Sequence, residues 1–169
     1  HLGTQELIGR IALLEGESLS PGETAMVQFR SESILSGKYG DRFIIRSFSP
    51  MHTIGGGTLI DPSPSKSRRL QQELPKRLRR LIDGDEYIRS EEVIYLRSVR
   101  GIFYPEFQVR SGLSDKDCSK NLELLQKQGQ VFCVDSVSGH YLHVEHVKRV
   151  GKFVSRVIKN HHQKFPERE

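Results

Sequence analysis

The sequence predicts an α+β protein in which a small, incomplete β-barrel precedes a helical module and a further helix. Residues 1–62 read as short strands with a period of 2 and regular turn signals, and most of residues 66–162 have the helical period of 3.6. Residues 61–65 contain two prolines and two serines, which continue neither a strand nor a helix. The 169 residues therefore divide into two small domains.

Four strand-like segments account for most of residues 1–62, namely residues 7–14, 24–33, 42–47 and 52–60. Short strands separated by turn signals favour a small barrel or sandwich. Four strands are few for closure, and the chain begins on strand-like sequence. We therefore expect this barrel to lack an element upstream.

Three consecutive glycines, Gly55, Gly56 and Gly57, stand between strand-like residues. A phosphate-binding loop would need its glycines to open a helix, with a Lys-Ser/Thr pair or a downstream acid, and neither is present. Glycines inside a strand mark a bulge or a close approach of backbone. This run therefore indicates a barrel and excludes a nucleotide site.

Residues 63–84 are predicted to be a linker and a basic helix. The pattern predicts a helix over residues 66–74, an interruption or kink at Pro75, a second stretch over residues 76–82 and an end at Gly84. Residues 64–80 contain seven basic side chains against one Glu: Lys66, Arg68, Arg69, Lys76, Arg77, Arg79 and Arg80. Such a cluster is typical of contact with a polyanion, and the alternative is a solvated charged face.

Residues 85–143 follow the order of a winged helix: three helices and then a hairpin. The first helix begins at residue 90 or near residue 85 and ends at residue 99, and the second covers residues 105–109. The third is capped by Ser114 and ends at Gly129. Strands are predicted at residues 131–134 and 140–143. The third helix balances three acids with three lysines, which suits a phosphate backbone poorly.

A last helix is predicted from about residue 144 to residue 162, with an apolar stripe at intervals of three and four. This stripe either packs on the winged helix or belongs to the first helix of a further module. Residues 144–169 hold seven basic side chains against three acidic ones. They form the second basic cluster of a chain with formal charge +5.

Composition excludes several classes of function. No apolar run is long enough for a membrane helix, and no secretory signal is visible, which favours the cytoplasm. Cys118 and Cys133 lack metal-ligand spacing and are expected to be reduced core residues. Neither the seven histidines nor the serines form a catalytic or metal-binding set, so we predict no catalytic residue and no metal site.

A candidate RNA-binding surface lies around the third and fourth strands. Arg46, Lys38, Phe48 and His52 and the glycine backbone have the chemistry to grip phosphate and ribose. The alternative is that Phe48 is a core residue and that Arg46 pairs with an acid.

Three motifs carry a family resemblance: LSPGE at residues 19–23, DRFIIR at 41–46 and TIGGG at 53–57. Together they resemble the third domain of elongation factor Tu-like translation GTPases, and specifically of the bacterial selenocysteine-specific elongation factors. HLGT at residues 1–4 and the Asp61-Pro62 exit toward winged helices also look like that family. The resemblance is specific over the barrel and looser over residues 66–143.

The resemblance implies a role in delivering selenocysteinyl-tRNA to the ribosome at UGA codons. The barrel would contact the tRNA through Arg46, Ser47, Phe48 and His52, and Arg68 and Arg69 would contact RNA nearby. An mRNA hairpin would be read by later winged helices, of which residues 144–169 open the next. GTP and Mg²⁺ belong to the GTPase domain of such a factor, so this chain is expected to need no cofactor, to be no enzyme and to be a monomer.

Two other functions fit the same residues. A winged-helix DNA-binding transcription regulator with a β sensor domain would require a basic third helix. A purely structural interaction module would show no affinity for RNA even at ~50 mM salt.

Overall fold

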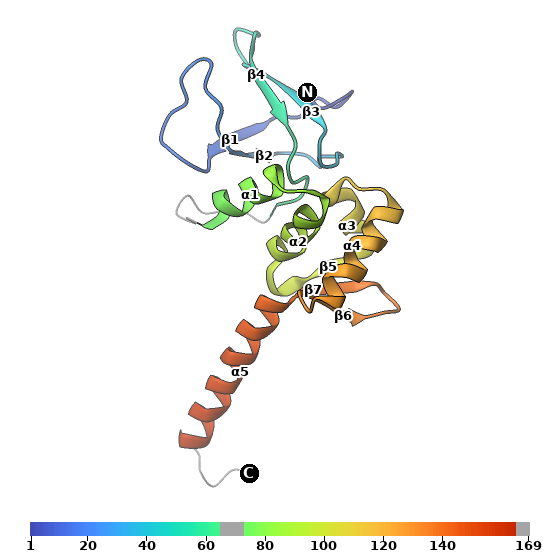
Figure 1. Cartoon of the computed structure of the whole chain (residues 1–169). Helices are drawn as coiled ribbons and strands as arrows, with labels where there is room; N and C mark the ends of the chain where they lie inside the picture. The colour runs from blue at the N-terminus through green and yellow to red at the C-terminus, as the bar shows by residue number, and fades with distance from the viewer. Residues whose placement is uncertain (65–72, 165–169) are drawn as a thin grey trace.

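The computed structural model describes residues 1–64 and 73–164, and its strands come first and its helices afterwards (Figure 1). The mixed α and β composition expected from the sequence is confirmed. The first part contains β1 (Gly9–Leu13), β2 (Val27–Ser31), β3 (Arg42–Arg46) and β4 (Thr53–Thr58). All four strands lie inside the predicted segments.

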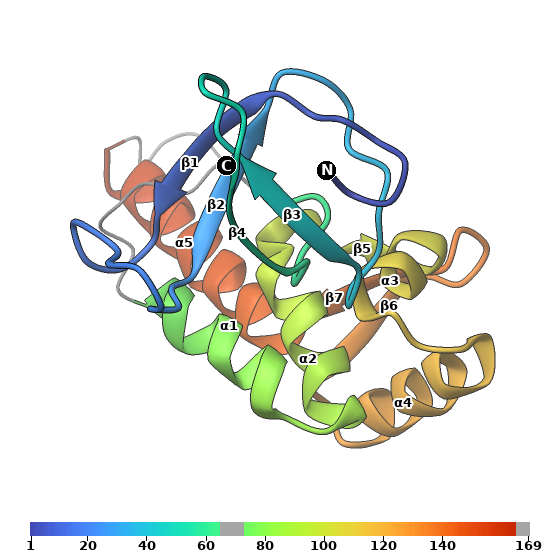
Figure 2. The same ribbon diagram turned by 90° about the horizontal axis from the view of Figure 1, so that it is seen from above.

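The four strands form two antiparallel hairpins. β1 pairs with β2 from Gly9↔Ser31 to Leu13↔Val27, and β3 pairs with β4 from Arg42↔Thr58 onward. Within the described residues no ladder joins the two hairpins, although a bridge ties Leu2 to Phe43 of β3. In the view from above, the two hairpins run in different directions and lie in front of the helical module (Figure 2).

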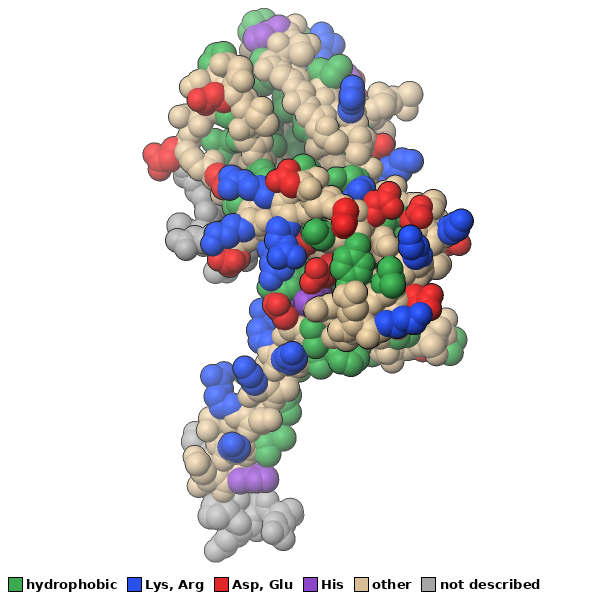
Figure 3. Space-filling model, viewed as in Figure 1, with side chains coloured by type: hydrophobic (Ala, Val, Ile, Leu, Met, Phe, Trp, Pro, Cys, Tyr) green, Lys and Arg blue, Asp and Glu red, His purple; other side chains and the backbone are tan. Residues whose placement is uncertain are grey.

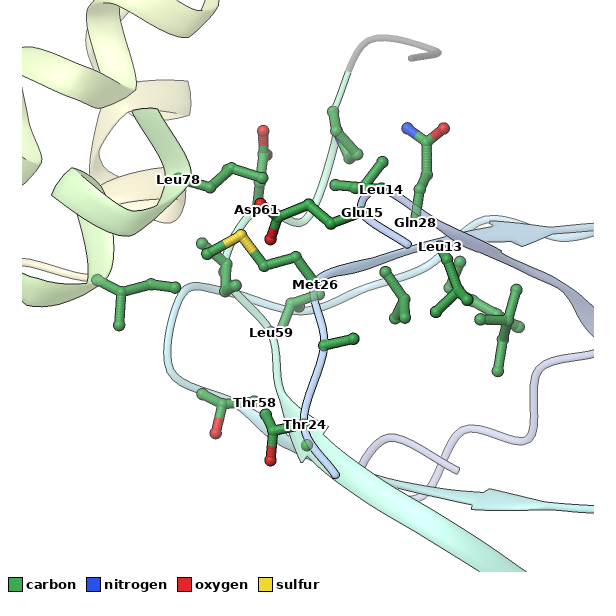
Figure 4. A pocket seen from close by; sticks show the side chains of 18 of the residues that line it. Leu13, Leu14, Glu15, Thr24, Met26, Gln28, Thr58, Leu59, Asp61 and Leu78 are labelled. Carbon is green, nitrogen blue, oxygen red and sulfur yellow. The ribbon is translucent and has the colours of Figure 1, made fainter. Parts of the chain in front are cut away.

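The hairpins and the first helix enclose an open cavity of about 1810 Å³. Figure 4 shows the side chains around it, including Leu13 and Met26 from the first hairpin, Leu59 after β4 and Leu78 of the helix. Among residues 1–64, Leu2 is the hydrophobic residue that is buried. The space between the hairpins is therefore lined by apolar side chains but is not filled by them. The well-packed core lies elsewhere.

Phe43 explains two of the three consecutive glycines. A Cβ on Gly56 would lie 2.7 Å from the Phe43 carbonyl oxygen, and one on Gly57 would lie 2.8 Å from Cζ of the Phe43 ring. The register also shifts between Ile45 and Arg46. The predicted bulge and close backbone approach are both confirmed, while Gly55 has open space around its Cβ position.

The first helix, α1 (Glu73–Asp83), is continuous through Pro75. The predicted interruption at this proline is wrong, because Pro75 lies in the first turn, where a backbone N–H has no partner within the helix. The part of the prediction that falls on residues 66–72 lies outside the described residues. Leu78 and Leu81 are the buried leucines of this helix.

The helical module contains three helices and three short strands in the order α2, β5, α3, α4, β6, β7. The Asp85 side chain caps α2 (Glu86–Leu96), so the earlier of the two expected starts is right; the helix ends before residue 99, where a 3-10 turn follows (Ser98–Arg100). α3 spans Tyr104–Ser111, and α4 (Asp115–Lys127) is capped by Ser114 as predicted.

A three-stranded sheet closes the module in the order β5-β7-β6. β6 (Val131–Asp135) and β7 (His140–His143) were predicted as a hairpin, whereas β5 (Ile102–Phe103) was not. The described core consists of nine buried residues from α1, α2, α3, α4, β5 and β6: Leu81, Val93, Ile94, Ile102, Phe107, Cys118, Leu122, Leu125 and Val131.

The two cysteines are free but differ in burial. Cys118 is a core residue, as predicted, while Cys133 is exposed. The prediction for Cys133 is wrong because β6 is an edge strand from which only Val131 is buried.

Ion pairs join the hairpins to the helices across the predicted domain boundary at residues 61–65. Arg110 of α3, which is 3% exposed, pairs with Asp61 and donates to the Ser63 carbonyl oxygen at 2.7 Å. Arg79 of α1 forms two hydrogen bonds of 2.8 Å with the Glu15 carboxylate. The boundary predicted from sequence is therefore a packed junction.

The last helix, α5 (Val144–Lys164), projects away from the rest of the molecule (Figure 1). Its first turns are tied to the module: Glu145 pairs with Arg77 at 3.7 Å, and Arg149 donates to Ser98 Oγ at 3.0 Å. These contacts fix the direction in which the helix leaves the module.

The joint at the base of α5 should be sensitive to pH. His146 Nε2 donates to the Tyr95 carbonyl oxygen at 2.7 Å, and burial holds the pKa of its imidazole below the ordinary value of 6.5. His143, Glu145 and Arg149 are the other titratable or charged groups that face it. Below pH 6.5 the unfolded chain takes up a proton that the folded protein resists, so stability should fall with pH in this window.

Urea unfolding between pH 7.5 and 5.5 tests this expectation. The wild type should lose stability as the pH falls, and His146→Gln should show a flatter profile, because the amide keeps an N–H donor but does not titrate. Profiles of equal slope would assign the pH dependence to another group.

Candidate nucleic-acid interface

The end of β3 and the loop that follows it bring together four of the predicted RNA-binding residues: Arg46, Ser47, Phe48 and His52. The Ser47 N–H donates to the His52 carbonyl oxygen at 2.9 Å, and the His52 N–H donates to Ser47 Oγ at 3.2 Å. The Ser47 hydroxyl also contacts His52 Nδ1 at 2.9 Å and donates to the Pro50 carbonyl oxygen. Ser47 and His52 thus close the loop on itself.

Apolar side chains project from the tip of this closed loop. Phe48 is 88% exposed, which excludes the alternative that it is a core residue. Met51, in the same loop, is 65% exposed. An exposed aromatic ring on a hydrogen-bonded loop is the arrangement on which a base or ribose can stack.

The outer face of β3 carries two arginines. Arg42 and Arg46 lie on the same side as Ile44, because alternate residues of a strand share a face. No ion pair of Arg46 occurs among the described residues, contrary to the alternative of pairing with an acid. Arg42 was not predicted as a site residue, although the alternation of residues 42–46 contained that signal.

Lys38 does not join this surface. It lies before β3, where its N–H donates to Asp41 Oδ2 at 2.9 Å, and its neighbour Tyr39 lies under Arg89 of the helical module. The loop with Phe48 lies at the other end of β3. The structure therefore brings together Arg46, Ser47, Phe48 and His52 but separates Lys38 from them.

The basic cluster at residues 64–80 is only partly described. Arg68 and Arg69 lie outside the described residues. The four described cations of α1 are all paired with acids: Lys76 with Glu73, Arg77 with Glu92 and Glu145, Arg79 with Glu15, and Arg80 with Glu91 and Glu92. Arg77 is largely covered by its partners, whereas the Lys76–Glu73 pair is exposed on the surface. Because each of the four cations already has an acidic partner, they are weaker candidates for phosphate contact than unpaired cations.

Glu92 is the centre of this network. Its side chain is fully buried between Arg77, at 3.0 Å, and Arg80, at 2.7 Å. Burial raises the pKa of the Glu92 carboxyl above its usual value, while the two guanidiniums oppose that rise. Arg77 also stacks on the Tyr95 ring at 3.6 Å from the centroid. The network thus holds α1 against α2.

α4 carries no net charge, because three lysines stand against three acids. Glu123 pairs with Lys127, which lowers the pKa of the Glu123 carboxyl. Asp115 accepts hydrogen bonds of 2.8 Å from the Tyr104 hydroxyl and from Gln108. A helix with balanced charges attracts a phosphate backbone poorly.

Metal-ligand clusters and membrane-length helices are absent from the part of the chain that the structure describes. Residues 1–64 and 73–164 contain no group of three or more His, Cys, Asp or Glu side chains that could hold a metal ion. No helix within these ranges is both long enough and apolar enough to span a membrane.

Comparisons with known proteins agree with the resemblance seen in the motifs. Residues 1–66 match the family model "Selenocysteine-specific elongation factor, beta-barrel domain". The whole chain is 28% identical over 171 residues to a selenocysteine-specific elongation factor of Desulfomicrobium baculatum. This match covers 100% of the chain and 26% of that relative, so the chain spans about a quarter of the relative's length. No solved structure matches the chain.

The resemblance is confirmed over the barrel by the family match to residues 1–66, and the 28% identical relative supports it over the rest of the chain. The alternative of a transcription regulator gains no support from them.

Proposed function

We propose that this chain helps deliver selenocysteinyl-tRNA to the ribosome at UGA codons. Residues 1–66 match the β-barrel domain of selenocysteine-specific elongation factors, and the whole chain is 28% identical to part of such a factor. The carrying observation is the family match over the barrel, which includes the exposed loop after β3. GTP and Mg²⁺ would act in a GTPase domain outside these 169 residues. The chain itself would be a cytoplasmic, monomeric, non-enzymatic part of the factor.

The barrel contributes tRNA contact through the loop between β3 and β4. Phe48 stacks on a base or ribose, and Arg46 and Arg42 contact phosphates along the outer face of β3. Ser47 and His52 hold the loop in shape. Arg68 and Arg69 remain predicted RNA contacts beyond the described residues.

The helical module acts as a winged-helix arm between barrel and mRNA-binding modules. Its order of helix, strand, helix, helix and hairpin, with β7 at the centre of the sheet, supports this assignment. The neutral α4 favours an arm over a reader of nucleic acid. We assign residues 1–62 to the barrel, 63–84 to the linker and basic helix, 85–143 to the winged helix and 144–169 to the opening of the next.

Binding of selenocysteinyl-tRNA to the full-length, GTP-bound factor tests the role of the loop. Arg46→Gln with Phe48→Ala should weaken binding roughly 10- to 100-fold, because one stacking contact and one charged contact to phosphate are lost. The matched control is Arg10→Gln with Ile34→Ala, which removes an exposed arginine and an exposed apolar side chain elsewhere in the same domain. Equal affinities for the two double variants would exclude the loop from the tRNA contact.

A further inference from the structure

α5 has two opposite faces. Six apolar side chains, each between 38% and 57% exposed, follow one side: Val147, Val150, Phe153, Val154, Val157 and Ile158. Cations recur on the other side at intervals of four, four and three: Lys148, Lys152, Arg156 and Lys159. At 3.6 residues per turn the two stripes are centred on opposite sides of the helix. Figure 3 shows blue side chains along one edge of α5 and green ones along the other.

The four cations, which we call the α5 basic stripe, are available to a ligand. The one acidic residue of α5, Glu145, lies in its first turn and forms an ion pair with Arg77 of α1. No salt bridge to the stripe occurs among the described residues. This distinguishes the stripe from α1, where every described cation has an acidic partner.

The surface between these cations is open and only slightly concave. A shallow groove of about 700 Å³ is lined by the stripe and by the small residues Gly151 and Ser155, with Asn160 and Gln163 at its end. Gly151 has open space around its Cβ position. A sugar–phosphate strand can approach the helix closely there, with neutral donors beside the cations.

We propose that the α5 basic stripe binds the phosphate backbone of RNA without reading bases. Its length from Lys148 to Lys159 is about 16 Å, and successive cations are separated by about 4.5–6 Å along the axis, which suits a row of phosphates. The choice of RNA over DNA rests on the proposed function, whereas the contact with phosphate does not. The guanidinium of Arg156 lies over the Phe153 ring, 5.6 Å from its centroid, at the border of the two sides. The three lysines of the stripe are centred opposite the apolar side, so they stay exposed when protein covers that side.

A lipid surface is the competing partner, because a helix with one apolar side and one basic side is also typical of binding to an anionic membrane. The apolar side of α5 carries no Trp or Leu and only one aromatic residue, Phe153, so it offers few of the bulky side chains that such helices insert into the bilayer. The vesicle measurement below distinguishes the two partners.

Binding of the 169-residue chain to a 20-base-pair RNA duplex of arbitrary sequence, at 50–200 mM salt, tests the proposal. Four phosphate contacts predict that log K falls with log salt with a slope of about −3 to −4. The triple variant K148Q/K152Q/K159Q should make the slope less steep by about 2–3 and should weaken binding at 50 mM salt on the order of 100-fold. Gln keeps nearly the helix propensity of Lys, which circular dichroism can verify.

The matched control is K116Q/K120Q/K127Q, which removes three exposed lysines from α4. This control variant should change the affinity for the RNA duplex by no more than about threefold. Lysines outside the contact act on RNA only through long-range attraction, which salt screens. Equal losses in both triple variants, or a wild-type slope weaker than −1, would overturn the proposal. So would unchanged RNA binding accompanied by lost binding to phosphatidylserine vesicles. The loop variants at Arg46 and Phe48 test the tRNA contact separately, so failure of one proposal is distinguishable from failure of the other.

Discussion

Replacing Arg110 with methionine should destabilise the protein by about 3 kcal/mol at pH 7, because it leaves a buried carboxylate without its cation. Arg110 joins α3 to the end of the barrel through Asp61 and the Ser63 carbonyl. The Asp61 side chain is 11% exposed, so water cannot replace the guanidinium. Methionine preserves much of the packed volume, so the cost reports on charge and hydrogen bonding. Urea unfolding at pH 7 measures it.

The pH dependence of this variant gives a second readout. Burial already raises the pKa of Asp61 above 3.8 while Arg110 opposes that rise. Without Arg110 the folded-state pKa should rise further, so the penalty should shrink as acid protonates the carboxyl. Asp61→Asn combined with Arg110→Met should cost less than the sum of the two single changes, with a coupling of about 1–3 kcal/mol. Arg10→Met, at an exposed site, should stay within about 0.5 kcal/mol of wild type. Additive effects would show that Asp61 and Arg110 are not coupled.

The sequence pointed to Asp61 only as the start of a linker. Prolines and serines after it predict a break in secondary structure, and the strands do end there. Its partner Arg110 lies 49 residues away in the chain, and nothing local connects the two. Local patterns place elements, whereas the contacts that join the elements depend on the three-dimensional arrangement.

The same distinction explains which parts of the candidate interface were predictable. Arg46, Phe48 and His52 belong to one hairpin loop, so their proximity follows from the chain itself. Lys38 was grouped with them by charge. The five residues of β3 place its two ends about 13 Å apart, so Lys38 lies beyond the opposite end of the strand from the loop, and its contact with RNA stays a prediction.

Strand β5 shows the limit of periodicity. It contains only Ile102 and Phe103, too few residues to display a period, and it forms by pairing with Tyr141 and His140 of β7. Cys133 was misassigned for a related reason, since its burial depended on β6 being the edge of that sheet.

The glycine run should respond to alanine in a graded order that tests its two roles. Gly56→Ala should be the most damaging, at about 2 kcal/mol or more, because its Cβ would lie 2.7 Å from the Phe43 carbonyl oxygen and backbone cannot move cheaply. Gly57→Ala should cost less, because the close atom belongs to the Phe43 ring, and Phe43→Leu should relieve part of that cost. Gly55→Ala should be neutral or stabilising by about 0.5 kcal/mol, since open space receives its methyl group and Gly is unfavourable within a strand.

The affinity of the full-length factor for tRNA then shows whether a glycine is needed for the stability of the hairpin or for contact with tRNA. Gly56→Ala should disturb the register of β4 and hence the loop, so affinity and stability should fall together. Gly55→Ala offers the sharper result, because no contact within the described residues explains a glycine there. If it leaves stability intact but weakens tRNA binding, ligand backbone must approach at Gly55. If both Gly55→Ala and Gly56→Ala leave stability and affinity unchanged, the close approach to Phe43 does not constrain this hairpin.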